Sequence, residues 1–593
     1  MSISSLRRFL TAPIAKVPRS TVIFWFVLSL AFAVIFGCLG LQQAFRAEYV
    51  VQDDARQHVF WMQRYLDPEL FPNDWIADYF QSIAPAGFAA LYRIPAAVGI
   101  NPLLFNKFLP MVLGLVTTVY AFGISVQLLP IPLVGFAGSL ILNQNLWVQD
   151  DLVSGTARSF LYPCFLAFLY YLLRSGGARP LWQTLVPCLV AIGLQGLFYP
   201  QFVLIMAGIL VLRLVEWQQG RLRLVSDRRR LAVSIGGLAV AVAMLLPYAL
   251  EESVYGGAIS GAVAQTMPEF AMKARSAFFT DNFWTYWVFG RRSGLFFWMM
   301  PLSVLALGLF PLMVALRFSA IDAARLSLMQ QVRHLSLFAQ AGITSLFLFF
   351  AAHALLFRLY LPGRYTQFTI QIFTSFAAAI VIVVLIDAVL GWAEQPRAAE
   401  ALRRRLAIAF VVFCGIVLLL SPKLYMFPKL SYVRGTAPDL YEFFAQQPKD
   451  ILVASLAKEV DNIPSFSQRS ILVGREYALP YQLGYYQPLR QRITDLIRAQ
   501  YSLKSSEVRE FVRQYGIDYW MIDRRYLSTL EVDEYHQIPV NDWLRQFKPE
   551  ITEAADRIRQ GENFAIAKFF RRCKAAEEDE LIVLDGKCIL DEQ

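Results

Sequence analysis

The sequence predicts a polytopic α-helical membrane protein with an α/β domain at its C-terminus. Three observations lead to this fold class. Of the 593 residues, 56% are hydrophobic and 17% charged, with a mean hydropathy of +0.45, whereas soluble domains carry about 25% charged residues. The charges cluster between apolar runs of about 18 to 25 residues, the length that crosses a bilayer as a helix. After residue 421 these runs give way to short alternating strand-like and helix-like segments.

The net charge of +10 comes from basic residues in short loops between the apolar runs. Such loops stay on the cytoplasmic side of a membrane, so the charge indicates topology. No nucleic-acid-binding motif is present, and we expect no nucleic-acid partner. The basic N-terminus and the strongest basic cluster, "RLRLVSDRRR" at 221–230, are both expected in the cytoplasm.

We expect about eleven membrane-spanning helices within a transmembrane domain at residues 1–421. The first span follows the cytoplasmic N-terminus, and an odd number of spans leaves the C-terminus outside the cytoplasmic (inner) membrane. The expected spans are 21–43, 106–127, 131–148, 154–173, 182–197, 200–217, 231–249, 294–316, 336–356, 366–390 and 406–421.

The first outer loop, residues 44–105, is expected to carry helices that lie on the membrane surface. In "RQHVFWMQRYL" the apolar residues Val59, Phe60, Met62 and Leu66 alternate with polar ones, which favours an interfacial helix over a span. "AGFAALYRIPAAVGI" is short and contains Arg93 and Pro95, so it is also expected to be interfacial.

Residues 422–593 are expected to form an extracytoplasmic α/β domain. The β-branched and aromatic runs "DILVASL", "SILVGRE", "DYWMIDRR" and "ELIVLDG" predict strands, and "YQPLRQRITDLIRAQY" and "SSEVREFVRQYG" have helical spacing. This alternation predicts a partly parallel sheet. Cys573 and Cys588 flank the last expected strand, in what would be an oxidising compartment, and are predicted to form a disulfide.

Two Gln-Asp-Asp steps, in "VVQDDARQH" and "WVQDDLVSGTARSF", follow odd-numbered spans and therefore share the predicted outer side. They contain Asp53, Asp54, Asp150 and Asp151. "RLYLPGRYTQF", with Arg358, Arg364 and Tyr365, lies on the same side. Ionisable residues at the membrane boundary are costly, which makes them functional candidates.

Together these residues have the chemistry needed to displace a lipid phosphate from a sugar. Asp53 or Asp54 can act as a general base toward an acceptor hydroxyl. Asp150 and Asp151 can orient the acceptor or, with the first pair, hold a divalent cation such as Mg²⁺ or Mn²⁺. Arg364 and Arg358 can bind a phosphate, whose geometry the guanidinium group matches.

Each of these residues also has a structural interpretation. The aspartates could cap helices or be solvated, and the arginines and Tyr365 could anchor the protein at the interface. Arg158 and His58 are secondary candidates. Arg158 could instead pair with Asp150 or Asp151, and His58, one turn after Asp54, could simply be solvated.

The chain resembles the GT-C superfamily of integral membrane glycosyltransferases, and in particular its poorly characterised bacterial members. The resemblance covers the whole chain in architecture and rests on "VVQDDARQH", "WVQDDLVSGTARSF" and "LYLPGRYTQF". It implies a sugar donor linked to polyprenyl phosphate, a base at Asp53 or Asp54, a second acidic site at Asp150 and Asp151, and a donor phosphate near Arg364.

The predicted function is therefore transfer of a sugar to an extracytoplasmic glycan, lipid or protein acceptor. Two alternatives remain open at this point: a transporter or flippase of lipid-linked sugars, and a non-catalytic membrane assembly protein. The absence of an internal repeat and the position of the charges at span ends disfavour a transporter.

Overall fold

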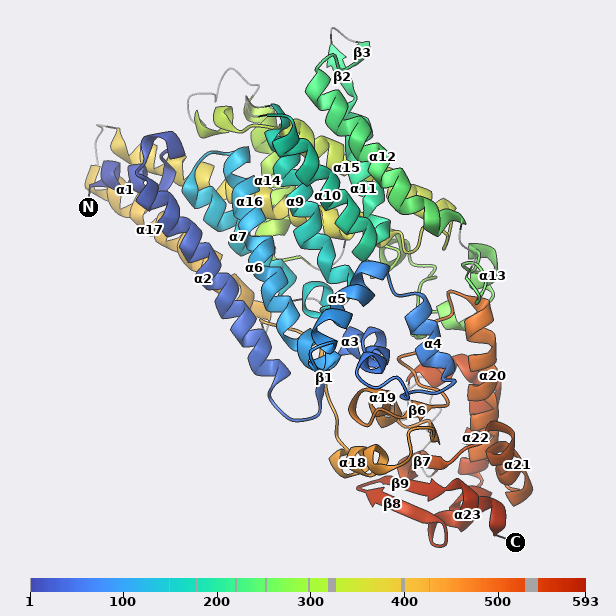
Figure 1. The fold of residues 1–593 in the computed structure, drawn as a ribbon. Helices are drawn as coiled ribbons and strands as arrows, with labels where there is room; N and C mark the ends of the chain where they lie inside the picture. The colour runs from blue at the N-terminus through green and yellow to red at the C-terminus, as the bar shows by residue number, and fades with distance from the viewer. Residues whose placement is uncertain are drawn as a thin grey trace.

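A computed structural model describes residues 2–148, 150–176, 180–218, 221–250, 253–296, 299–317, 327–395, 400–425, 427–527 and 542–592. Long helices run side by side, and the C-terminal sheet with its helices lies beyond one end of this bundle (Figure 1). We call this end the domain end.

The chain has the architecture of a multi-pass membrane protein. Six of the described helices are long and apolar enough to cross a membrane, and shorter apolar helices accompany them. The six are α2 (Arg19–Ala44), α6 (Pro102–Leu128), α12 (Arg228–Leu250), α15 (Leu335–Ala354), α16 (Gly363–Glu394) and α17 (Glu400–Leu420). The shorter helices of the bundle are α7 (Pro132–Leu146), α9 (Leu161–Leu173), α10 (Trp182–Phe198), α11 (Val203–Arg213) and α14 (Pro301–Arg317).

Helix α16 lies at the centre of the bundle and packs against α7, α14, α15 and α17. Helix α7 is buried along its whole length, and its polar side chains bond to neighbouring helices. Asn143 donates to Thr118, and Asn145 donates to Ser303 and Ser375. Buried amides of this kind stabilise contacts between helices within a membrane.

The segment between α2 and α6 contains β1 (Val50–Gln52), α3 (Asp53–His58), α4 (Trp75–Ser82) and α5 (Ala86–Ala96). Val59, Phe60 and Met62, which were expected to face the membrane, are instead fully buried. The reason is the C-terminal domain, which covers this segment: the rings of Phe60 and Tyr477 lie 5.2 Å apart. These three side chains therefore do not face the membrane, whereas Leu66 of the same group is exposed, and the placement of the segment at the membrane surface stays a prediction.

The C-terminal part carries a five-stranded mixed sheet in the order β6-β5-β7-β9-β8. The β5 strand pairs in parallel with β6 and β7, whereas β9 is antiparallel to β7 and β8. The strands are β5 (Leu452–Ala454), β6 (Ser470–Ile471), β7 (Tyr519–Asp523), β8 (Lys574–Glu578) and β9 (Leu581–Asp585).

Helices cover this sheet, and a disulfide links the residue before its strand β8 to the last helix of the chain. The helices are α18 (Pro438–Gln446), α20 (Leu483–Gln500), α21 (Ser505–Tyr515), α22 (Lys548–Arg559) and α23 (Gly586–Asp591). Gly516 ends α21 with a φ of 64°, a left-handed conformation that glycine adopts at low cost. The disulfide links Cys573, just before β8, to Cys588 in α23.

A small antiparallel ladder joins the segment between α2 and α6 to the C-terminal part; we call this segment the first outer segment, after the side on which the sequence predicts it. Strand β1 pairs with β4 (Tyr432–Arg434), with Gln52 opposite Tyr432. The Asp53 amide then donates to the Ser431 carbonyl at 3.1 Å. This pairing fixes the backbone where the first aspartate pair begins.

Candidate active site

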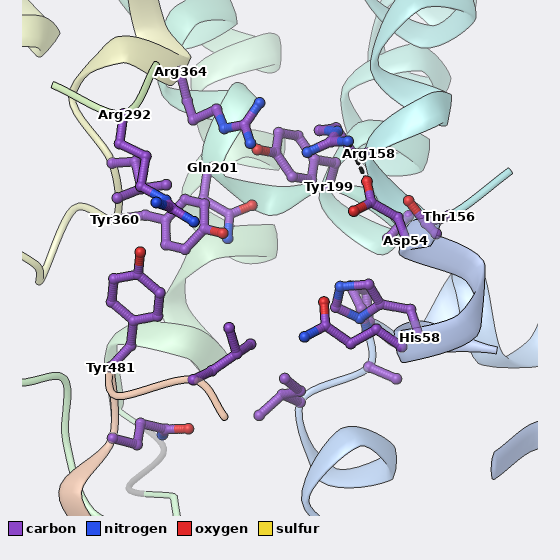
Figure 2. Close-up of a pocket in the computed structure, with 18 of the residues that line it drawn as sticks. Asp54, His58, Thr156, Arg158, Tyr199, Gln201, Arg292, Tyr360, Arg364 and Tyr481 are labelled. Carbon is purple, nitrogen blue, oxygen red and sulfur yellow. Dashed lines mark hydrogen bonds and ion pairs between the residues drawn. The ribbon is translucent and has the colours of Figure 1, made fainter. Parts of the chain in front are cut away.

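A cavity of about 500 Å³ lies at the domain end of the bundle, between the first outer segment, the α15–α16 connection and the C-terminal domain. Side chains from all three parts point into it (Figure 2). Three acidic residues line it: Asp53, Asp54 and Glu476. Six arginines also line it: Arg158, Arg275, Arg291, Arg292, Arg364 and Arg475.

The two aspartate pairs begin two short helices, α3 and α8 (Asp150–Val153), and Arg158 joins them. The Arg158 guanidinium pairs with Asp54 (Figure 2) and, through Nε at 2.8 Å, with Asp151. Arg364 lies 3.5 Å from the same Asp151 carboxylate. The structure therefore connects Asp54, Arg158, Asp151 and Arg364 in one chain of charges.

Asp150 does not take part in this series of ion pairs. Its carboxylate pairs with Arg291 at 3.1 Å and accepts a hydrogen bond from the Ser431 hydroxyl at 2.7 Å. It is not among the residues that line the cavity. Its contacts connect α8 with the chain segment that leads into β4.

Asp53 is the half-buried carboxylate of the site. It pairs with Arg56 at 2.7 Å, and Arg56 in turn lies 3.4 Å from Glu476. Burial raises the pKa of Asp53 to about 6, and the nearby negative charge of Glu476 adds to this, whereas Arg56 lowers it. A carboxylate with such a pKa can accept a proton near neutral pH.

The pKa of Asp54 is shifted in the opposite direction. Burial, the largest single influence, would raise its pKa, but the charges of the facing Arg158 and of Arg291 and Arg364 act together against it and hold the pKa below its usual value. An ion-paired carboxylate of low pKa is a poor proton acceptor, so Asp54 is suited to positioning Arg158. The neighbouring His58 also lines the cavity, and burial lowers its pKa to about 4, which keeps the imidazole neutral at physiological pH.

The four aspartates do not fit a divalent-metal site. Each of them faces an arginine: Asp53 faces Arg56, Asp54 and Asp151 share Arg158, and Asp150 faces Arg291. The Arg158 guanidinium occupies the position between Asp54 and Asp151 that a bridging cation would need. Within the described parts of the chain, no three histidine, cysteine or acidic side chains gather as metal ligands would.

The other residues predicted from the sequence lie in different environments. Arg364 and Arg158 line the cavity, whereas Arg358 is exposed and is not among the lining residues. Tyr365 is buried, and its hydroxyl donates to the Leu359 carbonyl at 2.8 Å, so it supports the connection between α15 and α16. Tyr360, rather than Tyr365, lines the cavity (Figure 2).

Several lining residues were not singled out from the sequence. Arg275, Arg291 and Arg292 come from the long segment between α12 and α14, and Gln57, Tyr199, Gln201 and Tyr481 add polar groups. A signal for the arginines does exist: "FGRRSG" places an arginine pair on the predicted outer side, against the usual distribution of basic residues.

Five polar atoms in the cavity wall have no hydrogen-bond partner in the described structure: the Arg158 Nε, which is ion-paired with Asp151, the Tyr481 hydroxyl, the Tyr199 hydroxyl, the Gln201 side-chain oxygen and the Arg364 Nε. Figure 2 shows the last three side chains on the same side of the cavity. Buried polar groups in native proteins are rarely left unpaired, so these atoms are available to water or to a polar ligand in the cavity.

Several solved structures match the chain, each at low sequence identity and with a TM-score below 0.5. The oligosaccharyltransferase AglB from Archaeoglobus fulgidus matches with a TM-score of 0.43 and 12% identity over 84% of this chain and 69% of its own. ArnT from Cupriavidus metallidurans matches with a TM-score of 0.46 and 12% identity over 96% and 99%. The arabinofuranosyltransferase AftD from Mycobacteria matches with a TM-score of 0.46 and 11% identity over 86% of this chain and 35% of its own.

No protein-family model matches the chain, and no curated protein matches it in sequence.

Proposed function

We propose that the chain is a membrane glycosyltransferase that moves a sugar from a polyprenyl-phosphate donor to an acceptor outside the cytoplasmic membrane. The observation that carries this proposal is the composition of one cavity. A half-buried carboxylate of raised pKa, Asp53, lines the same cavity as Arg364, a guanidinium whose Nε has no hydrogen-bond partner in the described structure. A base and a phosphate-binding group are the two parts that this transfer needs.

In the proposed reaction, Asp53 accepts the proton of an acceptor hydroxyl as its oxygen attacks the anomeric carbon of the donor sugar. The bond between that carbon and the phosphate oxygen breaks, and its electron pair remains on the phosphate. Arg364 stabilises the negative charge that develops there. Asp54 and Asp151 hold Arg158 in place, so that a second guanidinium faces the leaving group.

The proposed reaction uses no metal, because the four aspartates that could bind a cation are already paired with Arg56, Arg158 and Arg291. The acceptor class and the orientation in the membrane follow the expectations from the sequence: a glycan, lipid or protein acceptor, residues 1–421 in the membrane, and residues 422–593 outside it.

The test is transfer of a labelled sugar from polyprenyl phosphate by the purified protein. Asp53→Asn keeps the size of the side chain and removes the base, and general-base catalysis contributes about 10²- to 10⁴-fold in rate. We expect a loss of this order in kcat. Glu442→Gln removes an exposed carboxylate of the C-terminal part and is the matched control. Wild-type transfer by Asp53→Asn would rule out the proposed mechanism.

A further inference from the structure

A short segment beside the cavity leads from an exposed aromatic surface to the cavity wall. We call residues 283–294 the 283–294 strap; it contains a turn of π-helix at Trp284–Val288. Its C-terminal end is hydrogen-bonded to the start of α16. The Gly363 amide donates to the Arg292 carbonyl at 3.0 Å, and the Gln367 side chain donates to the Gly290 and Gly294 carbonyls, each at 3.1 Å.

One side of the 283–294 strap is apolar and exposed. The side chains of Phe283, Trp284 and Phe289 are exposed by 61%, 63% and 66%. Large exposed aromatic residues close together in sequence mark a surface that contacts a partner or a membrane.

The position of the strap identifies the membrane as that partner. Trp287 packs against the last turn of α15, with its ring 4.5 Å from that of His353. Helix α15 is apolar enough to span a membrane, and it leaves Phe347 and Phe350 exposed near the same end. Tryptophan and its aromatic neighbours at the end of a span are typical of the membrane interface.

The other side of the strap supplies a guanidinium group to the cavity. Arg292 lines the cavity, and its nitrogens donate to the Ala277 carbonyl at 3.2 Å and the Arg275 carbonyl at 3.1 Å. In the described structure no carboxylate pairs with it. Burial lowers its pKa, and the charged groups that act on it, Arg275 and Arg291, carry the same sign and lower the pKa further. A bound anion would compensate this positive charge.

Arg292 and Arg364 form a pair because the backbone bond between Arg292 and Gly363 brings their segments together. Figure 2 shows both guanidinium groups reaching into the same side of the cavity, with the Tyr360 ring and the Gln201 amide close by. Because both guanidinium groups line one cavity, both can contact an anionic headgroup bound in it.

We propose that the 283–294 strap admits an anionic lipid from the bilayer, with its aromatic side chains in the outer leaflet and Arg292 and Arg364 binding the phosphate headgroup. The inference rests on the proposed function in one respect: this lipid would be the sugar donor. It deepens that proposal by adding Arg292, in place of Arg358, to the arginines that bind the phosphate, and by placing the hydrocarbon chain beside Phe283, Trp284 and Phe289.

The experiment measures binding of undecaprenyl phosphate to the full-length protein in nanodiscs, independently of sugar transfer. A hydrogen bond to a charged group contributes about 1.5–3 kcal/mol, so Arg292→Ala should weaken binding by about 10- to 150-fold. Arg292→Lys retains the charge and should recover part of the affinity. Lys273→Ala removes an exposed cation from the same connecting segment and should leave the affinity unchanged.

A triple variant, Phe283→Ser with Trp284→Ser and Phe289→Ser, tests the apolar side of the strap. It should weaken binding of undecaprenyl phosphate but not of inorganic phosphate, which needs no membrane contact. Equal binding of both probes by this variant and the wild type would show a site for free phosphate and overturn the proposed lipid access.

Wild-type lipid affinity in Arg292→Ala would overturn the assigned phosphate group. If Arg292→Ala fails to fold, Arg292→Lys and the triple variant still decide. The outcome is separable from the proposed function: an Asp53→Asn protein should be inactive in sugar transfer yet bind the lipid normally. Lipid binding that depends on Arg292 without any transfer would contradict only the enzymatic proposal.

Discussion

Asp53 and Asp54 are adjacent in sequence but differ in their charged partners. Asp54 faces Arg158, whereas Asp53 shares Arg56 with Glu476, a nearly fully buried carboxylate that also pairs with Arg275 at 2.7 Å. The groups that face Asp53 are thus Arg56, Arg275, Asp54 and Glu476. Glu476 comes from the C-terminal domain, so this domain tunes the base that we propose on the first outer segment.

This arrangement predicts a pH dependence. Asp53 must be ionised to act as the base, so kcat/KM should fall as the pH drops through about 6, the pKa of this carboxyl. Glu476→Gln removes the facing negative charge, which favours the ionised form of Asp53 and lowers its pKa. The acid limb of the pH–rate profile should therefore move to lower pH in this variant.

The matched control for this prediction is Glu442→Gln, which removes an exposed carboxylate of the same domain. The acid limb of the pH–rate profile should keep its wild-type position in that variant. A profile of Glu476→Gln that coincides with that of the wild type, in a protein that unfolds at the same temperature, would show that Glu476 does not act on the base.

At the level of residues, the sequence predicted some of the side chains that line the cavity. The Gln-Asp-Asp steps and Arg364 stand out because charged groups at the ends of apolar runs are rare, and the structure gathers Asp53, Asp54, Arg158 and Arg364 in one cavity. The sequence could not distinguish Asp53 from Asp54, since Glu476 and Arg158 are distant in sequence. Arg292 and Arg275 were missed for the same reason, because long-range backbone contacts direct them into the cavity.

At the level of elements, the helices were more predictable than the segments between them. Apolar runs specify membrane helices through their own hydropathy, and a helix lies at each expected span with shifted ends. The expected span at 294–316, for example, begins at Pro301 as α14, because Gly294 belongs to the strap that Gln367 holds. The conformation of that strap depends on bonds to α16, which no local pattern records.

The disulfide between Cys573 and Cys588 allows a prediction at this level. It closes a loop with a sequence separation of 15 and ties the β8–β9 hairpin to α23. In the entropic model, closing a loop of this length raises the free energy of the unfolded chain by about 3 kcal/mol. Cys573→Ser with Cys588→Ser should therefore unfold at a lower denaturant concentration, and reducing agent should shift the wild type in the same direction.

Cys414→Ser is the control for the disulfide, because Cys414 is a free cysteine in α17. It should leave both the unfolding midpoint and its response to reducing agent unchanged. A double serine variant as stable as the wild type would show that the hairpin does not depend on this bond.

At the level of the whole molecule, the cavity needs three parts of the chain at once. The first outer segment supplies Asp53, the helical bundle supplies Arg364, and the C-terminal domain supplies Glu476. The pairing of β1 with β4 and the contacts of Glu476 with Arg56 and Arg275 hold these parts together. All of these groups lie at the domain end, so the site can work only if this end faces the compartment of the acceptor.

This requirement gives a prediction about orientation. The hairpin of β2 (Val215–Gln218) and β3 (Arg221–Leu224), next to the basic cluster 221–230, lies at the end of the bundle opposite the C-terminal domain (Figure 1). Basic clusters stay in the cytoplasm, so the C-terminal domain should be outside. A protease added to intact spheroplasts should cleave within residues 422–593 and spare 221–230, with a soluble cytoplasmic protein as the control for leakage. Cleavage at 221–230 with a protected C-terminal domain would place Asp53 and Arg364 in the cytoplasm, and transfer to an extracytoplasmic acceptor would then be impossible.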